Sequence, residues 1–334
     1  MGWTVLVAGG AGYIGSHMVK ALRRAGHVAV VFDNLSTGHA DAIGDAPLIR
    51  GDLRRRADLD AALSQARFDA VLHFAACAYV GESVLRPDKY YDNNVVGTLN
   101  LLEAMRSSGV ARLVFSSTCA TYGNPVRLPM DESHPQVPVN PYGATKLAAE
   151  RAMADYGTAF GLRTVALRYF NAAGCDPEGE LGERHDPETH LVPLVLGEAL
   201  RVRSGGRPED TALAVFGDDF DTRDGTCVRD YVHVADLCEA HLLALERLAG
   251  ARGSPFEGFN LGNGRGHTVK EVIAACRRVT GVDLRYRTVP RRAGDPPALV
   301  ADARRAGQVL GWAPRHADLE EIVRTAWNWL VARG

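Results

Sequence analysis

Two side chains four residues apart could carry out acid–base chemistry near neutral pH. Tyr142 and Lys146 lie at the start of a predicted helix, and the spacing puts them on one face of it. An ammonium group beside a phenol favours the phenolate, so we expect the tyrosine pKa to fall below about 10. Tyr142 is then a candidate general base. Thr118 closes a predicted strand, and its hydroxyl could hydrogen-bond a substrate oxygen and pass the proton along.

A glycine-rich turn follows the first predicted strand. The segment from Gly9 to Gly15 has the pattern G-x-x-G-x-x-G and opens a predicted helix. Glycines let the backbone turn tightly and approach a pyrophosphate, and the helix N-terminus then presents free N–H groups to the phosphates. The residues that we expect to bind a dinucleotide here are Gly9, Gly12, Tyr13, Ile14 and Gly15.

Asp33 ends the second predicted strand, at the offset of about 20 residues that a dinucleotide fingerprint requires. Its carboxylate can accept hydrogen bonds from both ribose hydroxyls, and its charge would repel a 2′-phosphate. The cofactor is therefore expected to be NAD rather than NADP. Asn34 follows it, and Asp52 and Leu53, further along the chain, are candidates for contact with the adenine.

The elements that position these residues alternate between short apolar runs and longer amphipathic stretches. Strands are predicted at residues 4–8, 28–32, 70–75, 113–116 and 164–168, and helices at 15–25, 59–66, 90–107 and 142–160. Strands that are apolar throughout are typical of a parallel sheet covered on both faces. The alternation predicts an α/β fold with a doubly wound, Rossmann-like parallel sheet.

The pattern loosens in the second half of the chain. Residues 171–190 are polar and rich in glycine, proline and acidic side chains, so we place the domain boundary at residues 170 and 171. Residues 1–170 would bind the cofactor, and residues 171–334 would form a smaller α/β domain for the substrate. It is predicted to hold a strand at 213–216 and helices at 191–204, 234–249, 269–280 and 319–331, with Thr268 and Glu271 as a capping box.

Composition narrows the classes of function. The 334 residues carry 38 lysines and arginines against 40 acidic residues, so there is no basic excess for nucleic-acid binding. No apolar run approaches the roughly 20 residues that span a bilayer, so no membrane partner is expected. The six cysteines stand singly, without Cys-x-x-Cys spacing. We expect neither disulfides nor a zinc site, no metal at all, and a cytoplasmic location.

The glycine-rich turn and the Tyr142-x-x-x-Lys146 pair resemble the extended short-chain dehydrogenase/reductase group. Finer motifs are similar to those of UDP-glucose 4-epimerases (UDP-galactose 4-epimerases), and they cover essentially the whole chain. These motifs are HFAA at residues 73–76, YYDNNV at 90–95, FSSTCATYG at 115–123, VRDYVHV at 228–234 and PRRAGDP at 290–296.

The resemblance implies an isomerase. Such an enzyme inverts C4 of UDP-glucose or UDP-galactose by transient hydride transfer to tightly bound NAD, through a 4-keto sugar. The resemblance also implies a homodimer that pairs through the helices at 90–107 and 142–160. Further cofactor residues would be Phe74, Ala75, Ala76, Asn93, Ser116 and Tyr169, besides Tyr142 and Lys146. Substrate residues would be Thr118, Tyr142, Asn171, His190, Leu191, Arg229, Arg292, Asp295 and Leu299.

Leu299 bears on substrate range, because a tyrosine at this position restricts some members of the resembling family to plain hexoses. A leucine leaves room for an N-acetyl group at C2, which predicts activity on UDP-GlcNAc and UDP-GalNAc as well. Three alternatives remain open: a UDP-uronate 4-epimerase, a UDP-uronate decarboxylase and an inactive NAD sensor. The related 4,6-dehydratases carry Asp-Glu directly after the threonine as acid and base for the loss of water. This chain has Cys119 and Ala120 there, which cannot play those roles, so we do not expect a dehydratase.

Overall fold

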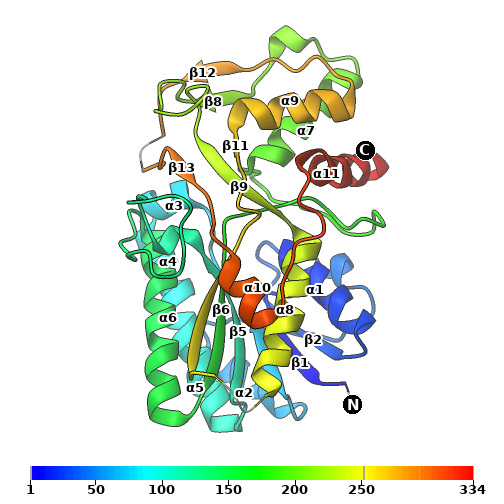
Figure 1. Ribbon diagram of the computed structural model, residues 1–334. Coiled ribbons are helices and arrows are strands. Elements are labelled where there is room, and N and C mark those ends of the chain that lie inside the picture. Colours follow the sequence, from blue (N-terminus) through cyan, green and yellow to red (C-terminus); the bar gives the residue numbers. More distant parts are fainter. Residues whose placement is uncertain (1, 251–252, 293, 334) are drawn as a thin grey trace.

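A seven-stranded sheet, all of whose paired strands run parallel, forms the larger part of the molecule in the computed structural model, which describes residues 2–250, 253–292 and 294–333 (Figure 1). Its strand order is β10-β6-β5-β4-β1-β2-β3. The strands are β1 (Thr4–Ala8), β2 (Val28–Asp33), β3 (Leu48–Arg50), β4 (Ala70–His73), β5 (Arg112–Thr118), β6 (Arg163–Tyr169) and β10 (Phe256–Leu261). The predicted fold class, a Rossmann-like parallel sheet with a second, smaller domain, is confirmed.

Both faces of the sheet are buried, as the apolar strands predicted. Along β1, Val5 and Val7 pack into one apolar core and Leu6 into the other. In Figure 1, α1, α8 and α10 cover one face, and α2, α5 and α6 cover the opposite face. The bounds are α1 (Tyr13–Arg24), α2 (Arg56–Ser64), α5 (Gly97–Ser108), α6 (Pro141–Phe160), α8 (Val234–Ala249) and α10 (Arg304–Leu310).

The strand order reverses between β1 and β4, which lie side by side in the middle of the sheet. In open α/β sheets, ligands bind outside the carboxyl ends of the strands at such a switch point. The glycine-rich turn leaves β1 at this point, and Phe74 leaves β4 beside it, where its N–H and that of Ala75 both donate to Ala8 O.

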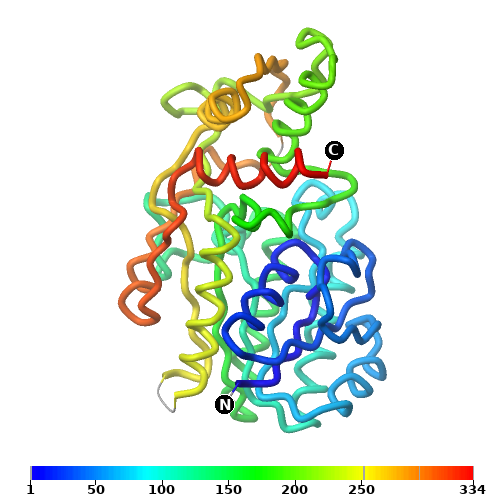
Figure 2. The backbone as a smooth tube through the Cα atoms, turned by 90° about the vertical axis from the view of Figure 1, so that its right-hand side faces the viewer, coloured from blue at the N-terminus to red at the C-terminus, as the bar shows by residue number. Residues whose placement is uncertain are grey.

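A smaller α/β unit lies beyond the carboxyl ends of the large sheet, as Figures 1 and 2 both show. It contains β9 with neighbours β11, β13 and β7, the pair β8–β12, and a separate apolar core under α7, α9 and α11. The bounds are β7 (Asn171–Ala173), β8 (Ala214–Phe216), β9 (Val228–His233), β11 (Gly266–Thr268), β12 (Arg287–Val289), β13 (Ala298–Leu299), α7 (Leu191–Arg203), α9 (Val269–Thr280) and α11 (Leu319–Arg333).

The second half of the chain also contributes to the large sheet. β10 pairs with β6 along its whole length, from Phe256 opposite Thr164 to Leu261 opposite Tyr169, and α8 packs beside α1 in the same apolar core. A division at residue 170 therefore does not place every strand of the large sheet in one half, and the boundary stays a prediction.

Most predicted elements appear within a few residues of their expected limits, and the capping box of Thr268 and Glu271 forms in full. The predicted helix 90–107 differs. It begins as α4 (Pro87–Tyr90), after α3 (Val80–Leu85), and continues through a π-helical turn (Tyr91–Val96) into α5. In the widened turn, Asn94 bonds the backbone of Cys77 through both amide atoms, which amphipathic periodicity does not reveal. Within the described residues, no helix is long and apolar enough to cross a membrane.

Candidate functional site

A cleft of about 1320 Å³ is lined by residues that follow the carboxyl ends of the large sheet and by residues of the smaller unit. Every residue predicted from the sequence to bind the cofactor or the substrate, or to take part in catalysis, lines this cleft. These residues come from both halves of the chain. The fold therefore gathers positions that are up to 290 residues apart, from Gly9 to Leu299, around one cavity.

The glycine-rich turn forms one end of the cleft. Gly9 has φ +80°, and a Cβ there would lie 2.4 Å from Ala75 N, so neither the conformation nor the space suits another residue. A Cβ on Gly15 would lie 2.1 Å from Gly9 O. Gly12 caps α1 without any side-chain hydrogen bond, so the first N–H groups of the helix, which begins with Tyr13 and Ile14, are left to an anion.

Asp33 stands beside this turn at the end of β2. Its Oδ2 accepts from Ala11 N (3.0 Å) and its Oδ1 from Leu35 N (2.8 Å), which fixes the carboxylate at the rim of the cleft. Asn34 donates to Asp52 Oδ2 (3.2 Å), and Asp52 makes its shortest side-chain contact with Arg54 (2.7 Å). The Arg54 guanidinium lowers the pKa of Asp52, so this carboxylate has a structural partner in addition to facing the cleft.

The central wall is made of residues that leave β4 and β5. Phe74, Ala75 and Ala76 follow β4, and Asn93 lies on the π-helical turn, where it donates to Asn94 Oδ1 (3.0 Å). Asn94 itself is buried and also donates to Thr145 Oγ1 (3.1 Å) on α6. Asn94 was not predicted as a site residue, although it stands within the YYDNNV motif.

The predicted catalytic group forms where α6 meets the end of β5. Asn140 caps α6 by accepting from Gly143 N (2.8 Å), which sets Tyr142 in the first turn, where the Thr118 hydroxyl is near enough to act on the pKa of the phenol. Lys146, one helical turn later, is 3% exposed and donates to Ser116 O (2.8 Å) above the Phe115 ring (4.7 Å). The i, i+4 spacing therefore places Tyr142 and Lys146 on the face of α6 that lines the cleft.

The pKa of Tyr142 differs from the expectation. Burial raises it to about 12, more than the hydrogen bond from Thr118 lowers it. Burial also lowers the pKa of Lys146 to about 7, with Cys77 and Glu150 opposing the shift. The lysine therefore does not lower the tyrosine pKa below 10 in the protein without a bound ligand. Burial disfavours the charged form of both groups, the phenolate of Tyr142 and the ammonium of Lys146.

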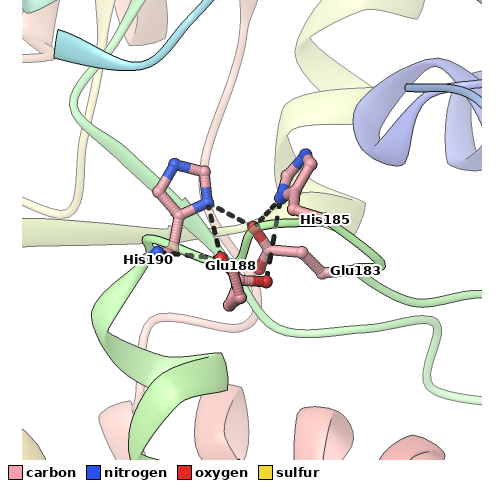
Figure 3. Close-up of side chains that lie close together, drawn as sticks. All are labelled: Glu183, His185, Glu188 and His190. Carbon is pink, nitrogen blue, oxygen red and sulfur yellow. Dashed lines mark hydrogen bonds and ion pairs between the residues drawn. The ribbon is translucent and has the colours of Figure 1, made fainter. Parts of the chain in front are cut away.

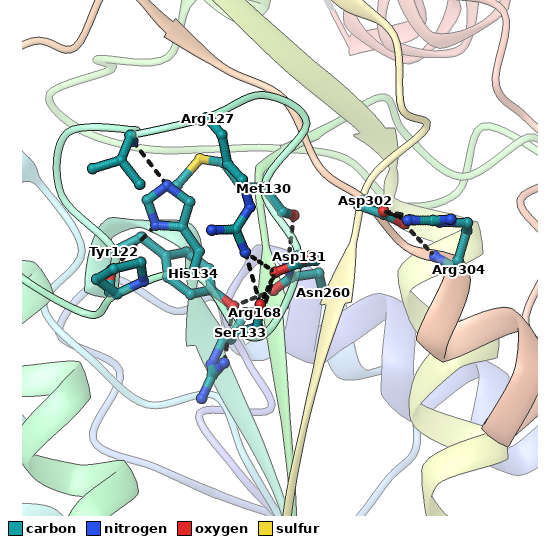
Figure 4. Close-up of polar contacts among 12 residues, drawn as sticks. Tyr122, Arg127, Met130, Asp131, Ser133, His134, Arg168, Asn260, Asp302 and Arg304 are labelled. Atoms are coloured by element: carbon teal, nitrogen blue, oxygen red, sulfur yellow. Dashed lines mark hydrogen bonds and ion pairs between the residues drawn. The ribbon is translucent and has the colours of Figure 1, made fainter.

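A buried polar network lies directly behind the catalytic strand, and sequence reasoning missed it. Glu150, on α6 one turn beyond Lys146, forms a two-contact ion pair with Arg168 (2.9 and 2.7 Å) and accepts from Ser117 Oγ (2.5 Å). Arg168 donates to Tyr122 Oη (2.9 Å), which donates to Asn260 Oδ1 (2.7 Å), as Figure 4 shows in part. An arginine inside an otherwise apolar strand is the signal that could have revealed it.

The predicted substrate residues line the opposite wall. β13 lies parallel to β9 with Leu299 opposite Arg229, and Arg229 Nη2 lies 3.8 Å from Asp295 Oδ1. Arg229 Nη1 is held by Val228 O and Pro296 O (both 2.9 Å), while the exposed Arg292 stacks over the Phe216 ring (4.3 Å). Two guanidinium groups on one wall can hold a diphosphate.

The other predicted residues lie between these walls. Tyr169 shares a hydrogen bond with His241 Nε2 (2.7 Å), and burial raises its pKa well above 10. Asn171 begins β7, and Leu191 begins α7. His190 precedes it and pairs with Glu183; burial alone would lower the His190 pKa, but this ion pair raises it.

The donor set at the sheet end of the cleft fits a dinucleotide with a free ribose diol. An uncapped helix N-terminus faces the cavity, glycines leave room for a pyrophosphate, and an acidic side chain closes the adjacent strand. Residues 5–262 match the NAD dependent epimerase/dehydratase family.

The chain belongs to the NAD-dependent epimerase/dehydratase family.

Similar members of this family are UDP-glucose 4-epimerases. The one from Halalkalibacterium halodurans is 51% identical over 327 residues, which cover 97% of this chain and 95% of the relative. A crystal structure of UDP-glucose 4-epimerase from Brucella ovis in complex with NAD has a TM-score of 0.91 and 51% identity, over 97% of each chain. The UDP-Glc/GlcNAc 4-epimerase of Campylobacter jejuni has a TM-score of 0.83 and 41% identity, over 99% of this chain and 100% of that chain. The resemblance stated from the motifs is confirmed.

Proposed function

We propose that the protein is an NAD-dependent isomerase that interconverts UDP-glucose and UDP-galactose by inverting C4 of the sugar. The single observation that carries the proposal is the arrangement of the cleft. Tyr142, Thr118 and Lys146 lie in the same cavity as an uncapped helix N-terminus on one wall and two arginines on the other. A dinucleotide and a nucleoside-diphosphate sugar can therefore meet at the tyrosine.

The glycine-rich turn, the start of α1 and Asp33 would hold NAD, which would supply a reversible hydride acceptor beside C4 of the sugar. Tyr142 takes the proton of the C4 hydroxyl, and Thr118, which lines the cleft with Tyr142, orients that oxygen. Lys146 places a cation behind the phenol and favours its ionised form whenever the lysine is protonated.

The sugar must turn over between the two transfers while the nucleotide stays in place. Arg229 and Arg292 are proposed to hold the diphosphate, with Asp295 on the uridine ribose and Asn171, His190 and Leu191 beside the sugar. Arg229 is suited to this anchoring role because two backbone carbonyls already fix one of its nitrogens. The 4-keto sugar can then rotate about its bond to the diphosphate and present its other face.

We also propose activity on the N-acetylated sugars. Leu299 lines the cleft and is 9% exposed, within a small apolar cluster that includes Tyr122, Met130 and Phe170. A leucine in this position leaves more space at the sugar end than a tyrosine would. The similarity to a UDP-Glc/GlcNAc 4-epimerase supports this broader range.

Two further proposals concern the setting of the enzyme. The helical segments that we expect to pair in a homodimer expose apolar side chains, namely Tyr91, Val96, Leu99 and Phe160. Sedimentation equilibrium on wild type and Leu99→Glu tests that pairing.

All six cysteines are free, which supports a reducing, cytoplasmic compartment. Fractionation of the source cells would test the location.

The function is tested by a turnover assay on purified protein without added NAD. Because the cofactor regains its starting oxidation state in each cycle, we expect interconversion of UDP-galactose and UDP-glucose without net NAD consumption, and NAD in the supernatant after denaturation. Stoichiometric consumption of NAD, or a requirement for NADP, would contradict the proposal. Parallel assays with UDP-uronates separate it from the uronate epimerase and decarboxylase alternatives, and absence of any turnover would favour the NAD sensor.

A further inference from the structure

The loop that leads into α7 carries the pair Glu-x-His twice, at residues 183–185 and 188–190. Figure 3 shows that the four side chains, Glu183, His185, Glu188 and His190, turn toward one another. One oxygen or nitrogen from each lies within 4.8 Å of the others. Two imidazoles and two carboxylates, all from eight consecutive residues, therefore converge on one point.

The spacing of these atoms suits a small tetrahedral cation. Bonds of about 2.0–2.2 Å from zinc to nitrogen and oxygen imply ligand atoms roughly 3.3–3.6 Å apart at the corners of a tetrahedron. His185 Nδ1 lies 3.1 Å from Glu183 Oε1 and 3.8 Å from Glu188 Oε2, and His190 Nδ1 lies 3.9 Å from Glu188 Oε1. His190 also contacts Glu183. Small movements would bring all four ligands to such corners.

The charges of the two carboxylates also favour a bound cation. Glu183 is only 8% exposed, and in the part of the chain that the structure describes neither Glu183 nor Glu188 pairs with a lysine or arginine. His185 Nδ1 is buried and makes no hydrogen bond, although it faces both carboxylates.

A second acidic group nearby provides a contrast. Asp176, Glu178 and Glu180 also lie together, but Lys20 contacts all three carboxylates and Arg24 contacts Glu178. Lys20 and Arg24 therefore offset two of the three negative charges of that group. The Glu–His group has only its own imidazoles, which are neutral when they act as metal ligands, so a divalent cation would balance its two negative charges.

The surroundings hold the imidazoles in place. The Tyr79 ring meets both His185 and His190 edge to face, with ring centres 5.8 and 6.4 Å apart, and Tyr13 meets His185 in the same way (6.3 Å). Glu188 Oε1 accepts from the backbone N–H groups of Thr189 (2.7 Å) and His190 (2.8 Å). Ligands that are fixed in this way lose little freedom on binding an ion.

We propose that Glu183, His185, Glu188 and His190 form a divalent-cation site, with zinc as the best-matched ion. Imidazole and carboxylate ligands in fourfold, roughly tetrahedral arrangement favour Zn²⁺ over Mg²⁺ or Ca²⁺, which take six or more oxygen ligands. The site revises the expectation of no metal, which was drawn from cysteine spacing and did not test histidine and glutamate. Its ion would fasten the loop from residue 183 to the start of α7, and so fix His190 and Leu191 in the cleft wall.

The test measures metal binding directly and does not depend on the proposed reaction. Tag-free protein is stripped with a chelator, titrated with Co²⁺ while the visible absorption of four-coordinate cobalt is followed, and then titrated with Zn²⁺. We expect saturation at one equivalent and full displacement of cobalt by zinc. His185→Gln and Glu188→Gln should each weaken binding by about 100-fold or more, because each removes a direct ligand.

Two matched controls keep the result specific. Glu178→Gln alters the second acidic group, and His316→Gln alters a histidine that pairs with Glu321 (2.6 Å) elsewhere on the surface; both should bind cobalt as wild type does. Thermal melts guard against misfolded variants, because Zn²⁺ should raise the Tm of wild type and of both controls but not of the ligand variants. Wild-type binding no tighter than that of the His185→Gln/Glu188→Gln double variant would overturn the proposal.

Discussion

Tyr142 and Lys146 lie in one pocket, and burial acts on both by favouring the uncharged form. It raises the pKa of Tyr142 to about 12 and lowers that of Lys146 to about 7. A base that must take a proton near pH 7 therefore needs positive charge from outside this pair. A cationic ring of the bound cofactor would supply it, which couples activation of the tyrosine to occupancy of the dinucleotide end of the cleft.

Tyr142→Phe tests the role of the phenol. Phenylalanine retains the ring and its packing but removes the acid–base group. We expect kcat to fall by about 10²–10⁴-fold, since general-base catalysis is worth that much. NAD content after denaturation and the Tm serve as controls and should stay close to those of wild type. Activity within a few-fold of wild type would show that another residue is the base.

Leu299→Tyr tests the size of the sugar pocket. A tyrosine in place of the buried leucine should occupy the space that an N-acetyl group needs. We expect kcat/KM for UDP-GlcNAc to fall by about 10–200-fold, the usual value of one steric feature of about 1–3 kcal/mol, while kcat/KM for UDP-glucose changes little. Assays of both proteins with both sugars decide it. Equal losses on the two sugars would mean that Leu299 only packs against Tyr122 and Phe170.

At the scale of elements, the Glu150–Arg168 pair joins α6 to β6 just behind the catalytic residues. Its side chains are only 3% and 6% exposed. Removing one partner should therefore leave a buried, unpaired charge. We expect Arg168→Met to lower the free energy of unfolding by about 3–5 kcal/mol, and the double variant Glu150→Gln/Arg168→Met to recover much of that loss.

The exposed pair Arg56–Asp60 on α2 is the matched control for this experiment. Breaking it with Arg56→Met should cost about 1 kcal/mol or less, because exposed ion pairs are screened by solvent. Urea unfolding of the three variants and wild type provides the comparison. A loss in Arg168→Met no larger than that in Arg56→Met would show that the buried pair does not stabilise the junction of α6 and β6.

Local patterns in the sequence predicted the elements that depend on local physics. Apolar strands, amphipathic helices and the capping box of Thr268 were all predicted near their observed positions, because each depends on neighbouring residues. Long-range polar contacts were not predicted. The π-helical turn around Asn94 and the buried Arg168 are stabilised by partners 17 or more residues away. Likewise, β10 joins the large sheet through pairing that its own sequence does not specify.

The predicted site residues came together because parallel strands end at one edge of the sheet. Gly9, Asp33 and Thr118 follow or close such strands, so the fold class alone places them near one another. The substrate residues on the opposite wall were predicted only from the resemblance to a family. The pairing of β13 with β9, which sets Leu299 opposite Arg229, has no local signal. Of the four residues proposed to bind a cation, only His190 was predicted as a site residue. The other three lie in a loop, where no hydrophobic periodicity indicates which side chains come together.

At the scale of the whole molecule, three buried histidines make stability depend on pH. Burial lowers the pKa of His73 and of His233 to about 3, and that of His241 to about 4, each from 6.5. They lie at the end of β4, at the end of β9 and within α8, so both parts of the fold are involved. Below pH 6.5 the unfolded chain binds three protons at these positions that the folded chain does not.

Because the unfolded chain binds more protons at these histidines than the folded chain does, the free energy of unfolding decreases as the pH falls. Stability from these histidines is fully present above pH 6.5 and is lost as the pH falls toward 4, with a slope of up to about 4 kcal/mol per pH unit for three protons. Asp230 opposes this by one proton below pH 6, since burial raises its pKa to about 6. We expect the free energy of unfolding in urea to fall steeply between pH 6.5 and 5. Because Asp230 cancels part of the histidine effect, His241→Gln, which cannot titrate, should reduce that slope by about a third to a half. A flat profile in wild type, or an unchanged slope in the variant, would mean that these histidines do not set the acid limit of the fold.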